Sequence, residues 1–295
     1  MNFKRVGILG AGLLGGSVAL ALKKFAPHVE IRLWGRRDTF FSWAEEHGVD
    51  QFSTDLEATV KGLDLVILCT PVGFMSDLVA RILKVQSSDQ PLLITDVGSV
   101  KAVVSESVRE VIKESGQSRV EFIGSHPMAG SEKSGCQDAC AELFVDKPCV
   151  IEACESDDQA LPTSVVALES FWQQLGANTI RMEAEVHDHA VAAISHFPHA
   201  IASLTTEVAL RGGPSVLSQV AGNGFLDTTR IASGNAAMWT EIMLSNREAL
   251  LDEMEAMKEL CESFSQVLKN NDEGALLTLL ESAKQKRDSF SPRKK

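Results

Sequence analysis

Two histidines and one arginine in this chain could move a proton and hold a carboxylate. His126 lies in the stretch GSHPMAGSEKSG, His199 lies in SHFPH together with Ser195, and Arg230 lies among small and apolar residues in GNGFLDTTRIASGNAAMW. Histidine changes protonation near neutral pH, and arginine forms charge-assisted hydrogen bonds with carboxylates. The chain has no tyrosine, so proton chemistry must fall on His, Asp, Glu, Lys, Ser or Cys. Each residue also has a structural alternative: the histidines could be buried and hydrogen-bonded within the protein, and the arginine could form an ion pair at the surface.

A glycine-rich turn near the N-terminus is typical of a dinucleotide site. Gly10, Gly12 and Gly15 form the pattern G-x-G-x-x-G between the strand-like run RVGILG and a helical run. The first glycine permits a tight turn, the second lets the backbone approach a pyrophosphate, and the third lets helix and strand pack closely. Leu13 and Leu14 open the helix, whose N-terminus would face the phosphates. The alternative is a glycine-rich turn without a ligand.

The end of the second expected strand bears on the choice of dinucleotide. An acidic residue there would bind the ribose of NAD, but the strand ends in Gly35, Arg36 and Arg37. Two guanidinium groups suit a 2′-phosphate, so we expect NADP rather than NAD. Asp38 keeps NAD possible, and a solvated arginine pair on a loop is the structural alternative.

Two further segments should lie at the carboxyl ends of parallel strands, where open α/β sheets bind ligands. One contains Cys69, Thr70 and Pro71, which we expect near the nicotinamide. The other is TDVGSVK, in which Ser99 would present a hydroxyl group. Ser99 could also cap the N-terminus of the next helix.

These residues need a framework, and the order of strand and helix patterns predicts one. Strand-like and helical runs alternate up to about residue 183, which indicates a mostly parallel, doubly wound sheet of the Rossmann type. Residues 184–288 show only helical periodicity, interrupted by Pro198. We therefore expect an α/β dinucleotide-binding domain over 1–183, an all-α domain over 184–288 for substrate and dimerisation, and a disordered tail over 289–295.

Composition excludes several classes of partner. The 295-residue chain is 44% hydrophobic and carries a formal net charge of −12, which argues against nucleic acid as a partner. It has no apolar run of membrane-spanning length. Its six cysteines follow no disulfide or metal-ligand spacing, so we expect free thiols, no metal site and a cytoplasmic location.

Taken together, the motifs resemble the prephenate/arogenate dehydrogenase family of tyrosine biosynthesis. The resemblance covers nearly the whole chain, through GILGAGLLGGS, TDVGSVK, GSHPMAGSEKSG, AAISHFPHAIA and TTRIASGNAAMW in this order. It implies an oxidative decarboxylation in which hydride leaves C4 of a cyclohexadienol, CO₂ leaves C1, and a phenol remains. It also implies a homodimer formed through the helical domain.

The resemblance assigns roles to individual residues. His126 matches the catalytic base, which accepts the proton of the ring hydroxyl, and Ser99 matches a serine that binds that hydroxyl or orients the histidine. Arg230 matches the residue that holds a substrate carboxylate. Four further residues match residues that contact the substrate: His199, Ser131, Glu132 and Ser195. Of these, Ser131 and Glu132 would lie at the mouth of the site. The substrate would be a small dicarboxylate.

Alternatives remain at three levels. Prephenate is favoured over arogenate, although no residue decides between a keto and an amino side chain. A β-hydroxyacid dehydrogenase would use a lysine of its helical domain, but none occurs between Ala184 and Lys258. A non-catalytic NADP-binding sensor would lack the base or have it displaced. We also expect no fused chorismate mutase or regulatory domain, so that any feedback by tyrosine would act at the active site.

Overall fold

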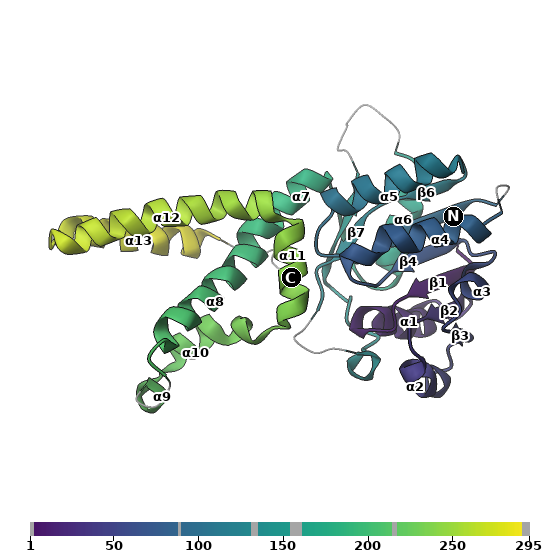
Figure 1. Ribbon diagram of the computed structural model, residues 1–295, viewed down its shortest axis with the longest axis horizontal. Helices are drawn as coiled ribbons and strands as arrows, with labels where there is room; N and C mark the ends of the chain where they lie inside the picture. Colours follow the sequence, from purple (N-terminus) through teal and green to yellow (C-terminus); the bar gives the residue numbers. More distant parts are fainter. Residues whose placement is uncertain (1–2, 88–89, 131–134, 154–160, 214–216, 291–295) are drawn as a thin grey trace. The chain divides into compact units, whose positions relative to one another are not determined.

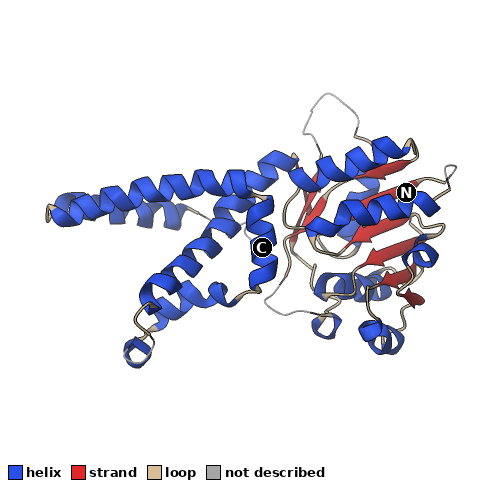
Figure 2. Cartoon of the chain, in the orientation of Figure 1, coloured by secondary structure: helices blue, strands red, loops and turns tan. Residues whose placement is uncertain are grey.

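The computed structural model describes residues 3–87, 90–130, 135–153, 161–213 and 217–290. The chain divides into two compact units, Met1–Arg247 and Glu248–Lys295. Figures 1 and 2 show that the strands belong to the first of these units.

A six-stranded sheet forms the centre of the first unit, and its strands run parallel. The strand order β3-β2-β1-β4-β5-β6 is that of a dinucleotide-binding fold, in which the order of the strands reverses between β1 and β4. The strands are β1 (Arg5–Leu9), β2 (Glu30–Trp34), β3 (Gln51–Ser53), β4 (Leu65–Leu68), β5 (Leu92–Asp96) and β6 (Val120–Phe122). The expected Rossmann-type architecture is confirmed, although the sequence patterns did not predict the short strand β3.

Helices cover both faces of this sheet, because alternate strand residues point to opposite sides. In β4, Leu65 and Ile67 join one hydrophobic cluster, while Val66 and Leu68 join the other. The first cluster also takes apolar residues from α1 (Leu13–Phe25), α2 (Phe41–Glu46) and α6 (Thr163–Gln174). The second takes them from α3 (Leu56–Val60), α4 (Met75–Val85) and α5 (Ala102–Ser115).

A second, three-stranded sheet was not expected. It has the order β7-β8-β9 and is made of β7 (Ser125–Pro127), β8 (Pro148–Glu152) and β9 (Asn178–Met182). The strand-like run VEFIGSHP over 120–127 therefore forms two strands that belong to different sheets. At Gly124 between them, a Cβ atom would lie 2.7 Å from Oε2 of Glu152, so a larger residue would have to displace this carboxylate.

The chain after β9 is helical where the structure describes it. Within the first unit it forms α7 (Ala184–Val191), a π-helical segment η4 (Ala192–His196), α8 (Phe197–Leu210), α9 (Leu217–Val220), α10 (Asn223–Thr229), η5 (Arg230–Ser233) and α11 (Ala236–Ser245). These helices belong to the same compact unit as the sheet, which extends to Arg247. The domain boundary at residue 184 therefore stays a prediction.

The second unit contains most of α12 (Arg247–Lys269) and all of α13 (Glu273–Ser289). Asp272 caps α13 by accepting a hydrogen bond from the Ala275 amide at 2.9 Å. Ser289, which the sequence patterns placed in the tail, is the last residue of α13, and residues 291–295 lie outside the described part. Among the helices that the structure describes, none has the length and apolar character needed to cross a membrane.

Candidate active site

The turn from β1 to α1 shows why two of its glycines are needed. Gly10 has a φ of +127°, and a Cβ atom there would lie 2.4 Å from the Cys69 carbonyl oxygen. A Cβ atom at Gly15 would lie 1.9 Å from the Gly10 carbonyl oxygen. At Gly12, by contrast, no atom of the described residues lies within 4 Å of the Cβ position. The protein backbone thus closes on Gly10 and Gly15, and the space beside Gly12 is open. Leu13 and Leu14 lie in the first turn of α1.

The segment after β4 lies against this turn, at the point where the order of the strands reverses. The contact of Gly10 with Cys69 joins the carboxyl ends of β1 and β4. Thr70 has a buried hydroxyl oxygen without a hydrogen-bond partner among the residues described here. Such an atom usually needs a partner, which a ligand can supply. Burial raises the pKa of the neighbouring Cys69 thiol, which keeps it neutral. The open glycine and the unpartnered hydroxyl fit a bound dinucleotide.

The two arginines after β2 are exposed, as a ligand-binding pair would be. The Arg36 guanidinium lies 5.2 Å from the centre of the Phe74 ring. Phe74 ends η2 (Val72–Phe74), the short helix that follows Pro71. The Gly73 amide in η2 donates a 2.6 Å hydrogen bond to Glu241 of α11. Arg36 is thus next to the segment after β4, while Gly35 is buried against Phe40.

His126 lies in β7 and is the first member of a hydrogen-bonded chain. Its Nδ1 lies 2.8 Å from Nε2 of His187, and Nδ1 of His187 lies 2.7 Å from Oδ1 of Asp188. A carboxylate only accepts, so His187 donates from Nδ1, and its Nε2 accepts from Nδ1 of His126. This arrangement leaves Nε2 of His126 with a free lone pair. Burial lowers the pKa of His126 well below its ordinary value, and His187, Lys101 and His196 lower it further, so the imidazole is neutral.

The backbone before His126 is fixed by a buried ion pair between Lys101 and Asp96. Ser125 donates from its amide to Asp96 Oδ1 at 3.1 Å and from its hydroxyl to the Asp96 carbonyl at 2.6 Å. The Ser125 carbonyl accepts from Lys101 Nζ at 2.9 Å, and Trp172 Nε1 donates to the Ser125 hydroxyl at 3.1 Å. Because Asp96 ends β5, these bonds hold His126 at the carboxyl end of the central sheet.

The π-helical segment explains how three more histidines come to the same place. In an uninterrupted α-helix, His196 would lie roughly 180° around the axis from His187, because each residue turns about 100°. A π-helical turn absorbs one extra residue, which reduces this angle to roughly 80°. Pro198 lies in the first turn of α8, directly after the π-helical segment, so the residue without an N–H stands where the regular α-helical hydrogen-bond pattern is already interrupted. Four of the seven histidines are therefore buried in one region: His126, His187, His196 and His199.

The histidines of η4 and α8 have distinct partners. Nδ1 of His196 lies 3.1 Å from the Asn246 amide nitrogen, and that amide also donates to the Asp188 carbonyl at 2.7 Å. Burial lowers the pKa of His196 to about 4. His199 stacks on Trp239 with ring centres 3.7 Å apart, and burial lowers its pKa too. Its Nδ1 is buried without a partner among the described residues, so it could bind a ligand.

The other predicted site residues lie in different surroundings. Arg230 is exposed and begins η5, which packs on α8, the helix of His199. Ser195 is half-buried in η4. Ser131 and Glu132 lie outside the described residues. Ser99 is half-buried between β5 and α5, and the alternative that it caps α5 is wrong, because Lys101 holds the N-cap position.

The residue patterns did not single out Asp96, Lys101, His187 and Asp188. Asp188 caps α5 by accepting from the amides of Lys101 and Ala102 at 2.8 and 2.9 Å. The sequence did hold a signal for these residues, because Asp96 and Lys101 are the two charged residues of TDVGSVK. His187 and Asp188 are two of the four polar residues of EVHDHAV.

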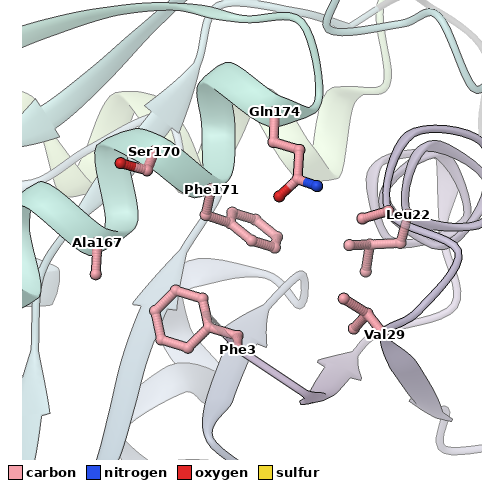
Figure 3. Close-up of a pocket in the computed structure, with 8 residues that line it drawn as sticks. Phe3, Leu22, Val29, Ala167, Ser170, Phe171 and Gln174 are labelled. Atoms are coloured by element: carbon pink, nitrogen blue, oxygen red, sulfur yellow. The ribbon is translucent and has the colours of Figure 1, made fainter. Parts of the chain in front are cut away.

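A small pocket elsewhere in the first unit has a different character. It is lined mainly by apolar side chains, with Phe3 and Phe171 in edge-to-face contact at 6.0 Å between ring centres (Figure 3). None of the residues predicted to bind cofactor or substrate lines it. This pocket is therefore distinct from the residues predicted to bind cofactor and substrate.

Comparison with known proteins agrees with this geometry. Residues 18–181 match the family model of the prephenate dehydrogenase nucleotide-binding domain, and residues 183–282 match that of the prephenate dehydrogenase dimerization domain. The chain is 33% identical over 290 residues to a prephenate dehydrogenase of Lactococcus lactis, covering 97% of this chain and 77% of that protein. It is 32% identical over 255 residues to a cyclohexadienyl dehydrogenase of Zymomonas mobilis, covering 84% and 83%.

A solved structure has the same fold over its full length. The prephenate dehydrogenase of A. aeolicus, in complex with hydroxyphenyl propionate and NAD+, superposes with a TM-score of 0.85 at 27% identity and covers 99% of both chains. With both family models matched in sequence order, this chain belongs to the prephenate dehydrogenase family of NAD(P)-dependent oxidoreductases.

Proposed function

We propose that this protein oxidatively decarboxylates prephenate to 4-hydroxyphenylpyruvate, with NADP+ as the preferred hydride acceptor. The observation that carries the proposal is the chain from Asp188 through His187 to His126. It fixes one tautomer of a buried neutral imidazole and leaves Nε2 free to accept a proton. This is the group that a hydride-removing enzyme needs for a hydroxyl substrate.

In the proposed reaction, Nε2 of His126 accepts the proton of the ring C4 hydroxyl. Hydride leaves C4 for the cofactor, the C1–carboxylate bond breaks to release CO₂, and the aromatic phenolate that remains takes the proton back from His126. The positive charge that develops on His126 is stabilised through His187 by the Asp188 carboxylate, as in other base–orienter pairs. Aromatisation favours the forward reaction, so the protein mainly has to position the reactants. Ser99 would bind the same hydroxyl or orient His126.

Arg230 would hold a substrate carboxylate, because guanidinium and carboxylate form strong charge-assisted pairs. Its exposure supports this role, since a free guanidinium can meet a ligand. His199 would contact the substrate through its unpartnered nitrogen, on a ring that Trp239 holds in place. Ser195, Ser131 and Glu132 remain proposed substrate contacts.

The nicotinamide ring, when bound, would supply the hydride acceptor. Gly10, Gly12, Gly15 and the first turn of α1, with Leu13 and Leu14, would hold the pyrophosphate. Thr70, with Cys69 and Pro71 beside it, would lie next to the bound cofactor.

The preference for NADP rests on Arg36 and Arg37, which follow Gly35. Both are exposed at the end of β2, where a 2′-phosphate would lie. Asp38 is the group that would favour NAD, which the A. aeolicus relative binds in its crystal structure.

We also propose a homodimer in the cytoplasm. α12 and α13 expose leucines that a second copy would cover: Leu251, Leu260, Leu268, Leu277 and Leu280. The match of residues 183–282 to a dimerization domain supports this assembly. The five described cysteines are free thiols, which fits a reducing compartment.

The test is absorbance at 340 nm with each substrate and each cofactor. We expect the largest kcat/KM with prephenate and NADP+. A higher value with arogenate would identify the protein as an arogenate or dual-specificity enzyme, as the Zymomonas relative suggests. Comparable values for NAD+ and NADP+ would contradict the cofactor preference, and absence of reduction with both substrates would contradict the proposed function.

A further inference from the structure

The ion pair between Lys101 and Asp96 is buried next to the site, and both side chains are 0% exposed. Burial raises the pKa of Asp96, and the Lys101 ammonium and two backbone amides offset this effect in part. Burying two charges costs several kcal/mol per ion before their attraction is counted, and two apolar side chains would often be as stable. Stability alone therefore does not explain why a charged pair occupies this position.

Lys101 is bound at both ends to the groups that hold His126. Its backbone amide donates to Asp188 Oδ1 at 2.8 Å, and the same oxygen accepts from His187 at 2.7 Å. Its ammonium donates to the carbonyl of Ser125, the residue that precedes His126, at 2.9 Å. A ring therefore runs from His126 through His187, Asp188, Lys101 and Ser125 back to His126.

The two arms of this ring fix different parts of the histidine. The arm through His187 fixes the imidazole plane and its tautomer. The arm through Ser125 fixes the backbone, because Ser125 is hydrogen-bonded at its amide, its hydroxyl and its carbonyl. Asp96 accepts two of those bonds and also binds the lysine, so the charged pair acts as one unit.

We propose that Lys101 is a positioning residue for the proposed catalytic base, holding both the backbone and the imidazole of His126 in the orientation that proton transfer needs. The inference rests on the proposed function, because positioning matters only if His126 accepts the substrate proton. Lys101 itself is fully buried and does not touch the substrate.

The charge of Lys101 adds a second effect on the same histidine. The ammonium lowers the pKa of His126, as do His187 and His196. The titratable groups around His126 come from every element packed there: Asp96 of β5, Lys101 before α5, Cys149 of β8, His187 and Asp188 of α7, and His196 of η4. Losing the lysine charge should therefore raise the pKa of His126.

The experiment compares Lys101→Met with Lys113→Met, a matched change at an exposed position of α5. Lys101→Met should lower kcat by about 10- to 100-fold, the cost of a small misplacement of a catalytic group, and leave the KM for NADP+ within about twofold. The acidic limb of the pH profile should move to higher pH, because the base is then easier to protonate. Lys113→Met should match the wild type in kcat, in the KM for NADP+ and in the pH profile.

A merely structural pair would lower the melting temperature but leave kcat and the pH profile unchanged below it, and that result would overturn the proposal. If Lys101→Met does not fold, the double variant Asp96→Asn, Lys101→Met removes both charges without leaving a buried carboxylate, and the same shifts are expected. Failure of both to fold would make the pair a requirement of folding and end the proposal.

NMR titration of the His126 imidazole separates this inference from the proposed function. Its pKa should rise in the Lys101 variant whether or not prephenate is the substrate. An inactive wild-type enzyme would contradict the function alone, whereas an unchanged His126 titration would contradict the role of Lys101.

Discussion

The histidines and the arginines predicted for the site differ in their surroundings: the histidines are buried, and the arginines are exposed. His126 is buried, and its imidazole is bonded through His187 to Asp188. Arg230, Arg36 and Arg37 are exposed. A base must meet one hydroxyl in one orientation, so the protein fixes it in advance. A group that binds a ligand anion can stay solvated until the ligand arrives. Mutations in the first region should therefore act on kcat, and mutations in the second on KM.

The largest effect should come from His126→Asn, which removes the base. We expect kcat to fall by about 10²- to 10⁴-fold, the usual contribution of a general base, while the cofactor still binds. Steady-state assays at 340 nm measure kcat, and fluorescence titration with NADP+ measures cofactor binding. A loss of only a few-fold would remove His126 from the role of base.

His187→Asn should have the next largest effect, because the shorter side chain cannot connect Asp188 to His126. We expect kcat to fall by about 10- to 100-fold with little change in the KM for prephenate. His189→Asn is the matched control, since His189 is exposed on the same helix. Equal activity of the two variants would mean that the hydrogen-bonded chain does not orient the base.

Arg230→Ala tests the role of the exposed arginines in binding ligand anions. Loss of a charge-assisted contact of roughly 1.5–3 kcal/mol should raise the KM for prephenate by about 10- to 100-fold, with a smaller change in kcat. Arg211→Ala, an exposed arginine at the end of α8, serves as the control. An unchanged KM would contradict the role of Arg230 as the carboxylate anchor.

The double variant Arg36→Ala, Arg37→Ala should have the smallest effect, confined to the cofactor. We expect the KM for NADP+ to rise by about 10-fold, because exposed charge pairs are partly screened, and the KM for NAD+ to stay nearly constant. Steady-state kinetics with each cofactor measures the ratio. Unchanged use of NADP+ would show that another group reads the 2′-phosphate.

Local patterns predicted most of the fold, because buried parallel strands and amphipathic helices each have their own periodicity. β3 was missed because its three residues are too few to show a period. The division of 120–127 into two strands was missed because it depends on pairing between distant segments, β6 with β5 and β7 with β8, which forms only in the folded chain.

The candidate site was predictable only in part. The glycine turn is a local motif, and its geometry is encoded within a few residues. The partner of His126 lies 61 residues away, and the bond from Asp188 to Lys101 spans 87 residues. The π-helical segment also changes which histidines share a face, so a regular helical period misplaces His187 relative to His196. The sequence shows these polar residues, but it does not show which of them meet in the folded chain.

The proposed mechanism depends most on a neutral, buried His126, and the pH dependence of kcat/KM for prephenate tests this directly. Burial lowers the pKa of His126 below the ordinary histidine value of about 6.5. The base works only when neutral, so activity should persist through pH 6.5 and fall only at clearly lower pH. The residual activity of His126→Asn should lack this limb. An acidic limb at or above pH 6.5 in the wild type would contradict the account.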